Sequence, residues 1–409
     1  MAVRRSRLAA ALALTALGLT ACGTTPGGKA DDPQDWQSVL SAAKGQTVDW
    51  YMWGGDATLN GFITGYLSDK LKPFGVGIKQ VKVSDTSQAI DTMLGEKQAG
   101  KNTGGAVDLV WVNGENFASG RQADLWACGW PQQLPNARYV DFSSPAVASD
   151  FGVPVAGCEA VWQSANSALV YNSAALEPSD VASVSSLFAW AKAHPGRFTY
   201  PAPPDFTGSM AVRTILYDSV GGPGKLAGKF SQQAYDEAAP KLWSRLDAIA
   251  PSLWRGGATY PQTQDQVEKM YSDGQIDAYF TYGPGAVGDQ VKKGVFPAST
   301  REAVLSVGNI ANTSFVGIPA NAAHAAAAKV VANLLQDPAT QLALYKAEGI
   351  FPAIDLARTT AAVRDQFAAV PVASSVLPLQ DLLKHAQPEL ASGYVTRIEK
   401  EWKTEVLQR

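Results

Sequence analysis

The sequence predicts an α/β protein with two doubly wound lobes. Between residues 47 and 112, apolar runs of strand length alternate with runs of helical periodicity, in the order strand, helix, strand, helix, strand. This alternation requires parallel strands joined by crossovers that cover both faces of a sheet. The chain has 409 residues, more than one core usually serves, and 46% of them are hydrophobic. We therefore expect a second lobe.

The amino terminus has the pattern of a bacterial export signal. Three arginines precede an uncharged apolar run at 8–19, which at about twelve residues is too short to cross a bilayer that requires roughly 20. The next residues, Leu-Thr-Ala-Cys, resemble the lipobox of bacterial lipoproteins. We expect removal of 1–21 as a signal peptide, lipid on Cys22 and a flexible tether over 22–34. The protein would then be exported and lipid-anchored to the outer face of the bacterial cell membrane; an uncleaved anchor is the alternative.

The first predicted strand, 47–53, ends in a glycine turn before a helix that contains Leu59. In an open α/β sheet this turn faces a crevice at the carboxyl ends of the strands. There Gly55 would let backbone N–H groups approach a ligand, and Asp56 could cap the helix. Trp53, Gly55 and Asp56 are therefore candidate ligand contacts, although an ordinary strand-to-helix turn has the same pattern.

The third predicted strand, 107–112, ends in a second polar turn. A strand at 77–83 and a helix at 86–98 precede it. This turn lies beside the first by topology, and Asn113 and Glu115 offer amide and carboxylate groups to a ligand. The alternative is a solvated helix start.

Two extended segments, 153–155 and 168–172, follow one another without a helix between them, which marks a crossing to the second lobe. A helix at 184–193 and a strand at 197–200 begin that lobe. Extended segments at 304–307 and 313–318 form the return crossing.

The stretch 205–209 brings small residues to a helix start in the second lobe. Free amides at Thr207, Gly208 and Ser209 would favour an anion or a carbonyl oxygen. Asp205 opposes an anion and shifts the expectation toward a cationic or zwitterionic ligand. Ordinary capping by Thr207 or Ser209 is the alternative.

Tyrosines provide the other candidates of the second lobe. Tyr260 precedes a helix at 265–272, and Tyr282 follows a strand at 276–281. Both could form flat walls for a cationic or ring-bearing ligand, although packing between elements is equally compatible. Asn312, in the return crossing, completes the set of candidate ligand contacts.

Cys128 and Cys158 are the only cysteines of the mature chain other than Cys22. Because an exported protein folds in an oxidising compartment, we expect a disulfide between them. Two separate buried thiols are the alternative.

The residues described so far resemble one family, the extracellular solute-binding proteins of bacterial ABC importers (family 1), in particular the YnjB-type branch related to spermidine, iron and thiamine binders. The resemblance covers nearly the whole mature chain. The stretches that carry it are Cys22, 53–56, 108–117, 205–209 and 318–322.

The resemblance implies a type II periplasmic-binding-protein fold, with two lobes joined by a hinge and the ligand in the cleft between them. It also implies delivery of the ligand to the permease of an ABC importer. The iron binders of the wider group use paired tyrosines. Because this chain has no adjacent pair of tyrosines, iron is disfavoured as its ligand. The expected division is lobe 1 at 35–160, lobe 2 at 161–308, a return to lobe 1 at 309–350, and carboxyl-terminal helices packing on the lobes at 351–409.

The expected function is capture of a small organic cation or zwitterion, thiamine-like or a polyamine, by a monomer without a cofactor or a metal. The alternatives are an oxyanion or a sugar as ligand, or a surface lipoprotein or enzyme without a transport role. The balance of 34 basic against 37 acidic residues gives no basic block for nucleic acid. Because the three histidines are far apart and no nucleophile-elbow, zinc-protease or C-x-x-C motif occurs, we expect no enzyme.

Overall fold

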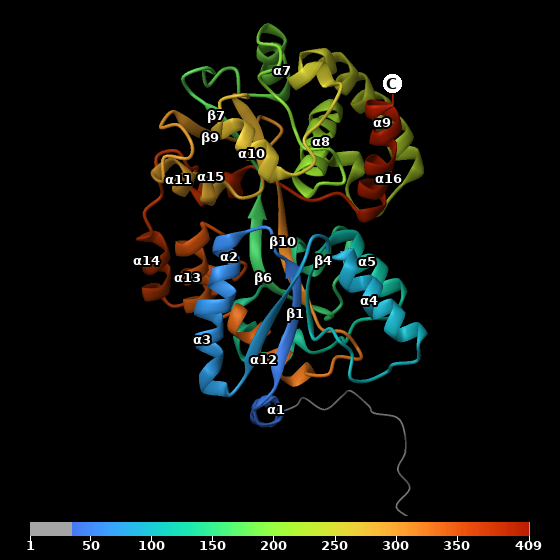
Figure 1. Cartoon of the computed structure of the whole chain (residues 1–409), viewed down its shortest axis with the longest axis vertical. Helices are drawn as coiled ribbons and strands as arrows, with labels where there is room; N and C mark the ends of the chain where they lie inside the picture. The colour runs from blue at the N-terminus through green and yellow to red at the C-terminus, as the bar shows by residue number, and fades with distance from the viewer. Residues whose placement is uncertain (1–34, 409) are drawn as a thin grey trace, which may run out of the picture. The chain divides into compact units, whose positions relative to one another are not determined.

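The computed structural model describes residues 35–408 (Figure 1). The expected signal peptide, Cys22 and the whole tether lie outside the described residues. None of the described helices combines the length and the apolar character that crossing a bilayer would need.

The first sheet has the predicted parallel strands at its amino-terminal side, in the order β2-β1-β3. Strand β10 joins β3 in the antiparallel direction, and β6 and β11 pair with β10. The alternation over 47–112 is therefore confirmed. The strands are β1 (Thr47–Trp53), β2 (Gly77–Val83), β3 (Leu109–Val112), β6 (Glu159–Asn166), β10 (Asn309–Gly317) and β11 (Ala386–Gln387).

Helices cover this sheet on both faces, and two aromatic contacts mark its core. The ring of Trp162 on β6 meets the rings of Trp50 and Trp111 edge-on, at centroid distances of 5.3 and 4.9 Å. The associated helices are α1 (Trp36–Ala43), α2 (Ala57–Phe62), α3 (Ser68–Leu71), α4 (Ser87–Gln98), α5 (Gly114–Gln122), α6 (Pro145–Ala148), α12 (Ala325–Leu335), α13 (Pro338–Glu348) and α14 (Ala361–Ala368).

The second sheet is small, with β7 (Ala168–Asn172) between β8 (Ala278–Thr281) and β9 (Thr300–Ala303), antiparallel to both. Most of the chain in this lobe is helical, and Figure 1 shows these helices packed around the sheet. They are α7 (Val184–Ala193), α8 (Phe206–Val220), α9 (Gln232–Ile249), α10 (Gln264–Ser272), α11 (Pro284–Lys292), α15 (Leu379–Lys384) and α16 (Ser392–Trp402).

Two predicted strands of this lobe were wrong. The segment 197–200 makes only one bridge, between Phe198 and Ala278, because the Phe198 carbonyl accepts from Trp254 N (2.9 Å) instead of extending the ladder. The strand expected at 304–307 lies earlier, as β9. Residues 304–307 leave the sheet, and Ser306 N bonds to Ala182 O (2.8 Å).

The chain passes between the sheets along β6 and β10, which lie side by side. Only Ser167 separates β6 from β7. Its N–H donates to Ile310 O (2.8 Å), and its hydroxyl accepts from Ile310 N (2.8 Å). Of the two extended segments expected at this crossing, 168–172 is β7, whereas 153–154 pairs with 149–150 and the connection to the first sheet is made by β6. The expected domain limits at 160 and 308 fall inside β6 and directly before β10.

Cys128 and Cys158, 30 residues apart, are bonded to each other in the structure. We expect the exported protein to carry this bond. Its reduction should lower the unfolding free energy by about 3–4 kcal/mol, because the bond restricts the conformations open to the unfolded chain. Intact-mass measurement after alkylation, with and without reductant, tests it. Two alkylated thiols in the sample without reductant would contradict the prediction.

Candidate ligand cleft

The carboxyl ends of β1 and β3 are neighbours, since these strands pair directly. Asp56 caps α2 as expected, and its Oδ1 accepts from Thr58 N (2.8 Å) and Leu59 N (2.9 Å). Trp53 at the end of β1 has 39% of its surface exposed. A Cβ on Gly55 would lie 2.1 Å from the Trp53 ring, so glycine is needed here to let that ring lie against the turn.

The turn after β3 presents the carboxylate of Glu115 and the amide of Asn113. Asn113 Nδ2 donates to Thr313 O on β10 (2.8 Å), so this amide holds the turn to the neighbouring strand. Glu115 is solvent-accessible, yet surrounding protein displaces bulk water around it and raises its pKa. The charge of Arg213 lowers that pKa, whereas Asp85 and Glu389 raise it. Glu115 therefore faces charged groups of the second lobe.

The start of α8 differs from its expected role as an anion site. Asp205 Oδ1 accepts from Thr207 N (3.0 Å) and Gly208 N (2.9 Å), and its Oδ2 accepts from Gln264 N (3.2 Å). The amides expected to be free at this helix start are thus bonded to Asp205. Gly208 has a packing role as well, because a Cβ there would lie 2.0 Å from Pro201 O.

Three of the candidates, Ser209, Tyr282 and Asn312, come together around a buried ion pair. Arg213 on α8 has a side chain that is 1% exposed, and its Nε lies 3.1 Å from Glu389 Oε2. Arg213 Nη1 donates to Ser209 Oγ (2.6 Å), and Nη2 donates to Tyr282 Oη (3.2 Å). Asn312 Nδ2 donates to Glu389 Oε1 (3.2 Å). Burial opposes the charge on Arg213, but Glu389, Tyr282 and Glu399 raise its pKa above the ordinary value.

Sequence analysis missed Arg213 and Glu389. A signal for Arg213 was available, because it is the one charged residue in the otherwise uncharged stretch 206–217. A charge on a buried helix face needs a partner. Nothing in the local sequence indicates Glu389 as that partner, since 176 residues separate the two.

Tyr260 is not brought to the other candidates. It is 3% exposed and packs against Tyr200 and Trp402, at ring-centroid distances of 5.2 and 5.0 Å, in the core of the second lobe. Phe206, which sequence analysis did not single out, is 47% exposed and lies 5.0 Å from the Tyr282 ring. Phe206 therefore contributes exposed aromatic surface beside Tyr282.

A turn of the first lobe inserts between these elements. Phe151, between β4 (Ser149–Asp150) and β5 (Val153–Pro154), has a φ of 41° and a ring that is part of the core of the second lobe. Its carbonyl accepts from Ser392 N (2.9 Å) at the start of α16. Its ring lies 6.3 Å from that of Phe206, and the Arg213 guanidinium lies 5.8 Å from the ring centre.

Carboxylates on the two sides of the cleft form two groups. In the first, Glu115 of α5 acts on Glu399 of α16. Burial and the charge of Glu115 raise the pKa of Glu399 to about 7, although the hydrogen bond from Ser209 and the charges of Arg213 and Lys403 lower it. In the second, Asp56 acts on Glu268 and Glu348. Burial raises both pKa values, that of Glu348 to about 7, and the charge of Asp56 adds to each.

The family is decided by comparison with known proteins. The profile of the bacterial extracellular solute-binding protein family matches residues 71–369. Protein YnjB of Escherichia coli strain K12 is 37% identical over 308 residues, which are 75% of this chain and 79% of that protein. The chain belongs to this family.

Solved structures share the fold of this solute-binding protein. An ABC transporter substrate-binding protein from Bradyrhizobium japonicum USDA 110 is 16% identical and has a TM-score of 0.63, over 88% of this chain and 99% of that one. The spermidine/putrescine ABC transporter substrate-binding protein PotD from Streptococcus pneumoniae is 12% identical, with a TM-score of 0.58 over the same shares. The expected two-lobe, type II binding-protein fold is confirmed.

Membership also confirms the expected role at the level of the family. An extracellular solute-binding protein is exported, binds a small solute and delivers it to an ABC permease. It performs no chemistry on the solute, so the expectation that this chain is not an enzyme is confirmed.

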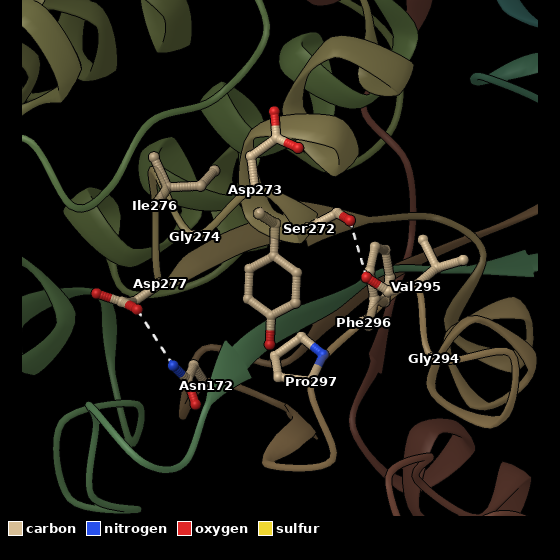
Figure 2. Close-up of a pocket in the computed structure, with 11 residues that line it drawn as sticks. Asn172, Ser272, Asp273, Gly274, Ile276, Asp277, Gly294, Val295, Phe296 and Pro297 are labelled. Carbon is tan, nitrogen blue, oxygen red and sulfur yellow. Dashed lines mark hydrogen bonds between the residues drawn. The ribbon is translucent and has the colours of Figure 1, made fainter.

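A pocket of about 400 Å³ in the second lobe is distinct from the cleft (Figure 2). It is lined by Asn172 and Asp277, whose side chains are hydrogen-bonded (3.3 Å). Asn172 ends β7, whereas the cleft lies toward Ala168, which pairs with Thr281 next to Tyr282. The pocket therefore lies at the opposite end of the strands, and none of the candidate residues lines it.

The carboxylates of the solute-binding protein should make its stability depend on pH. The pKa of Glu399 rises from its ordinary value of 4.5 to about 7 in the folded protein. The folded state therefore keeps this proton up to a higher pH than the unfolded chain does. This contribution favours folding at low pH and is lost as the pH rises from 4.5 through 7. We expect the unfolding free energy of Glu399→Gln to exceed that of the wild type most at pH 8, measured by urea titration.

Glu177→Gln is the matched control, because Glu177 is an exposed carboxylate of the second lobe, between β7 and α7. It should follow the wild type from pH 5 to 8. If the unfolding free energies of Glu399→Gln and the wild type differed by the same amount at every pH, the raised pKa of Glu399 would be contradicted.

Proposed function

We propose that this solute-binding protein captures a small organic cation with more than one amino group, of the polyamine type, and delivers it to its permease. The observation that carries the proposal is the excess of negative charge in the cleft. The charge of Glu115 raises the pKa of Glu399, and Arg213, which lowers the pKa of both, is already paired with Glu389. A bound cation would supply the missing positive charge.

The two groups of carboxylates favour a ligand with charges at two ends. Glu115 and Glu399 form one group, and Asp56, Glu268 and Glu348 form the other. Lys293 also lowers the pKa of Glu348, so the second group is partly compensated. An amino group at each end would bond to carboxylates of both lobes, so closure would complete the contacts.

Exposed aromatic surface supports a cation with an alkyl or ring-bearing body. Trp53 and Phe206 are 39% and 47% exposed, and Tyr282 lies beside Phe206. Such faces attract cations by about 0.5–2 kcal/mol each. A thiamine-like cation or a zwitterion fits these features as well, although a single charge would use only one group of carboxylates.

The other ligand classes have less support. The amides that an oxyanion would require at the start of α8 are bonded to Asp205. A sugar could stack on Trp53, but it would leave the carboxylates uncompensated. Structural neighbours from Listeria monocytogenes and Streptococcus pneumoniae are titled spermidine/putrescine transporters. At 12% identity they share the fold, so the proposal depends on the chemistry of the cleft.

Calorimetry with spermidine tests the proposal. We expect binding by the wild type and a loss of about 1.5–3 kcal/mol, roughly ten- to hundredfold in affinity, in Glu115→Gln, because a charge-assisted hydrogen bond is lost. Glu177→Gln should bind like the wild type. Absence of spermidine binding by the wild type, together with an uncharged solute released from the purified protein and identified by mass spectrometry, would contradict the proposal.

We also propose that the mature protein is anchored by lipid on Cys22, which the lipobox resemblance supports. Cys22→Ser removes the sulfur to which lipid would attach. We expect this variant to lose both lipid mass and membrane retention. Retention of an unlipidated wild-type chain would contradict the proposal.

A further inference from the structure

We propose that Glu389 is a specificity-determining residue: it occupies a carboxylate receptor made by Arg213, Tyr282 and Asn312, and thereby prevents the cleft from taking anionic solutes. This inference deepens the proposed function and rests on it for the identity of the cation. The receptor itself follows from the hydrogen-bond geometry around Glu389.

The donors around Glu389 are those expected around a bound carboxylate. Arg213 reaches both of its oxygens, with Nε 3.1 Å from Oε2 and Nη2 3.2 Å from Oε1. Tyr282 Oη and Asn312 Nδ2 donate to the same Oε1. A guanidinium that contacts both oxygens, with two further neutral donors, is a receptor for planar anions.

Three separate parts of the fold supply these donors. Arg213 lies on α8, Tyr282 directly follows β8, and Asn312 lies on β10, the strand that passes between the sheets. The side chains of Arg213 and Glu389 are 1% and 5% exposed. An ion pair on the surface does not need donors from three parts of the fold, so this buried arrangement is more elaborate than such a pair requires.

The occupant is fixed by its own chain segment. Pro388 O accepts from Tyr217 Oη (2.7 Å), and Leu390 is 1% exposed in the core of the second lobe. Residues on both sides of Glu389 are therefore anchored, and they hold its carboxylate in the receptor.

This occupancy decides the charge of the cleft. Arg213 and Glu389 together are neutral, so the Arg213 charge, which lowers the pKa of Glu115 and of Glu399, compensates those two carboxylates only in part. Ser209 connects the two systems, since its hydroxyl accepts from Arg213 (2.6 Å) and donates to Glu399 (2.6 Å). Without the Glu389 carboxylate, the Arg213 charge would act more strongly on Glu115 and Glu399, and Arg213 would accept an anion in place of Glu389.

The test uses Glu389→Ala with acetate as the probe, because acetate has the carboxylate that this variant lacks. We expect acetate to raise the melting temperature of Glu389→Ala saturably, by at least 3 °C above a matched chloride sample, and to leave the wild type unchanged. Glu389→Ala/Arg213→Met, which lacks the guanidinium, should not respond. Equal responses of Glu389→Ala and the wild type to acetate would overturn the proposal.

The second measurement is the affinity for spermidine. We expect Glu389→Gln, which keeps the size of the side chain and removes its charge, to bind spermidine at least tenfold more weakly than the wild type. This variant also decides the question if Glu389→Ala does not fold, and unchanged spermidine affinity would then overturn the proposal.

The two measurements separate the inference from the proposed function. Acetate rescue of Glu389→Ala without spermidine binding by the wild type would support the receptor and contradict the polyamine proposal. Spermidine binding by the wild type that neither Glu389 substitution alters would support the proposed function and contradict the receptor.

Discussion

The arrangement of the cleft depends on the electrostatic requirement of one buried guanidinium. Arg213 lies almost wholly out of water, and a charge in that position is tolerated only with a close counter-charge and saturated hydrogen bonds. Glu389, Ser209 and Tyr282 meet this requirement from three different segments of the chain. Because the pair is internally neutral, the proposed preference for a cation depends on the neighbouring carboxylates.

Elements whose pattern is set by local periodicity could be predicted from the sequence. The alternation from Thr47 to Val112 requires only hydrophobic spacing and turn residues, and the absence of a helix before 168–172 indicates that the chain crosses to the second lobe there. The segment 197–200 could not be assigned correctly in this way, since the partner of its carbonyl group, Trp254 N, is distant in the sequence.

The site was predictable to the extent that it follows strand ends. Asp56, Glu115 and Tyr282 were indicated because polar turns after strands gather at one edge of a sheet. Glu389 was not, because it follows a two-residue strand, β11, whose place beside β10 is set by tertiary contacts. Tyr260 has the composition of a ligand wall, and only packing against Trp402 assigns it to the core.

The turn at Phe151 has a consequence for the balance between open and closed lobes. A positive φ in a bulky residue costs of the order of 1–3 kcal/mol, and burying a phenylalanine ring returns about 1.5–3 kcal/mol. Since these quantities nearly cancel, withdrawing the ring from the other lobe would relax the backbone by about as much as it exposes apolar surface. Separating the lobes at this contact would therefore change the free energy little. A modest difference in solute affinity between the open and closed states can then decide their populations.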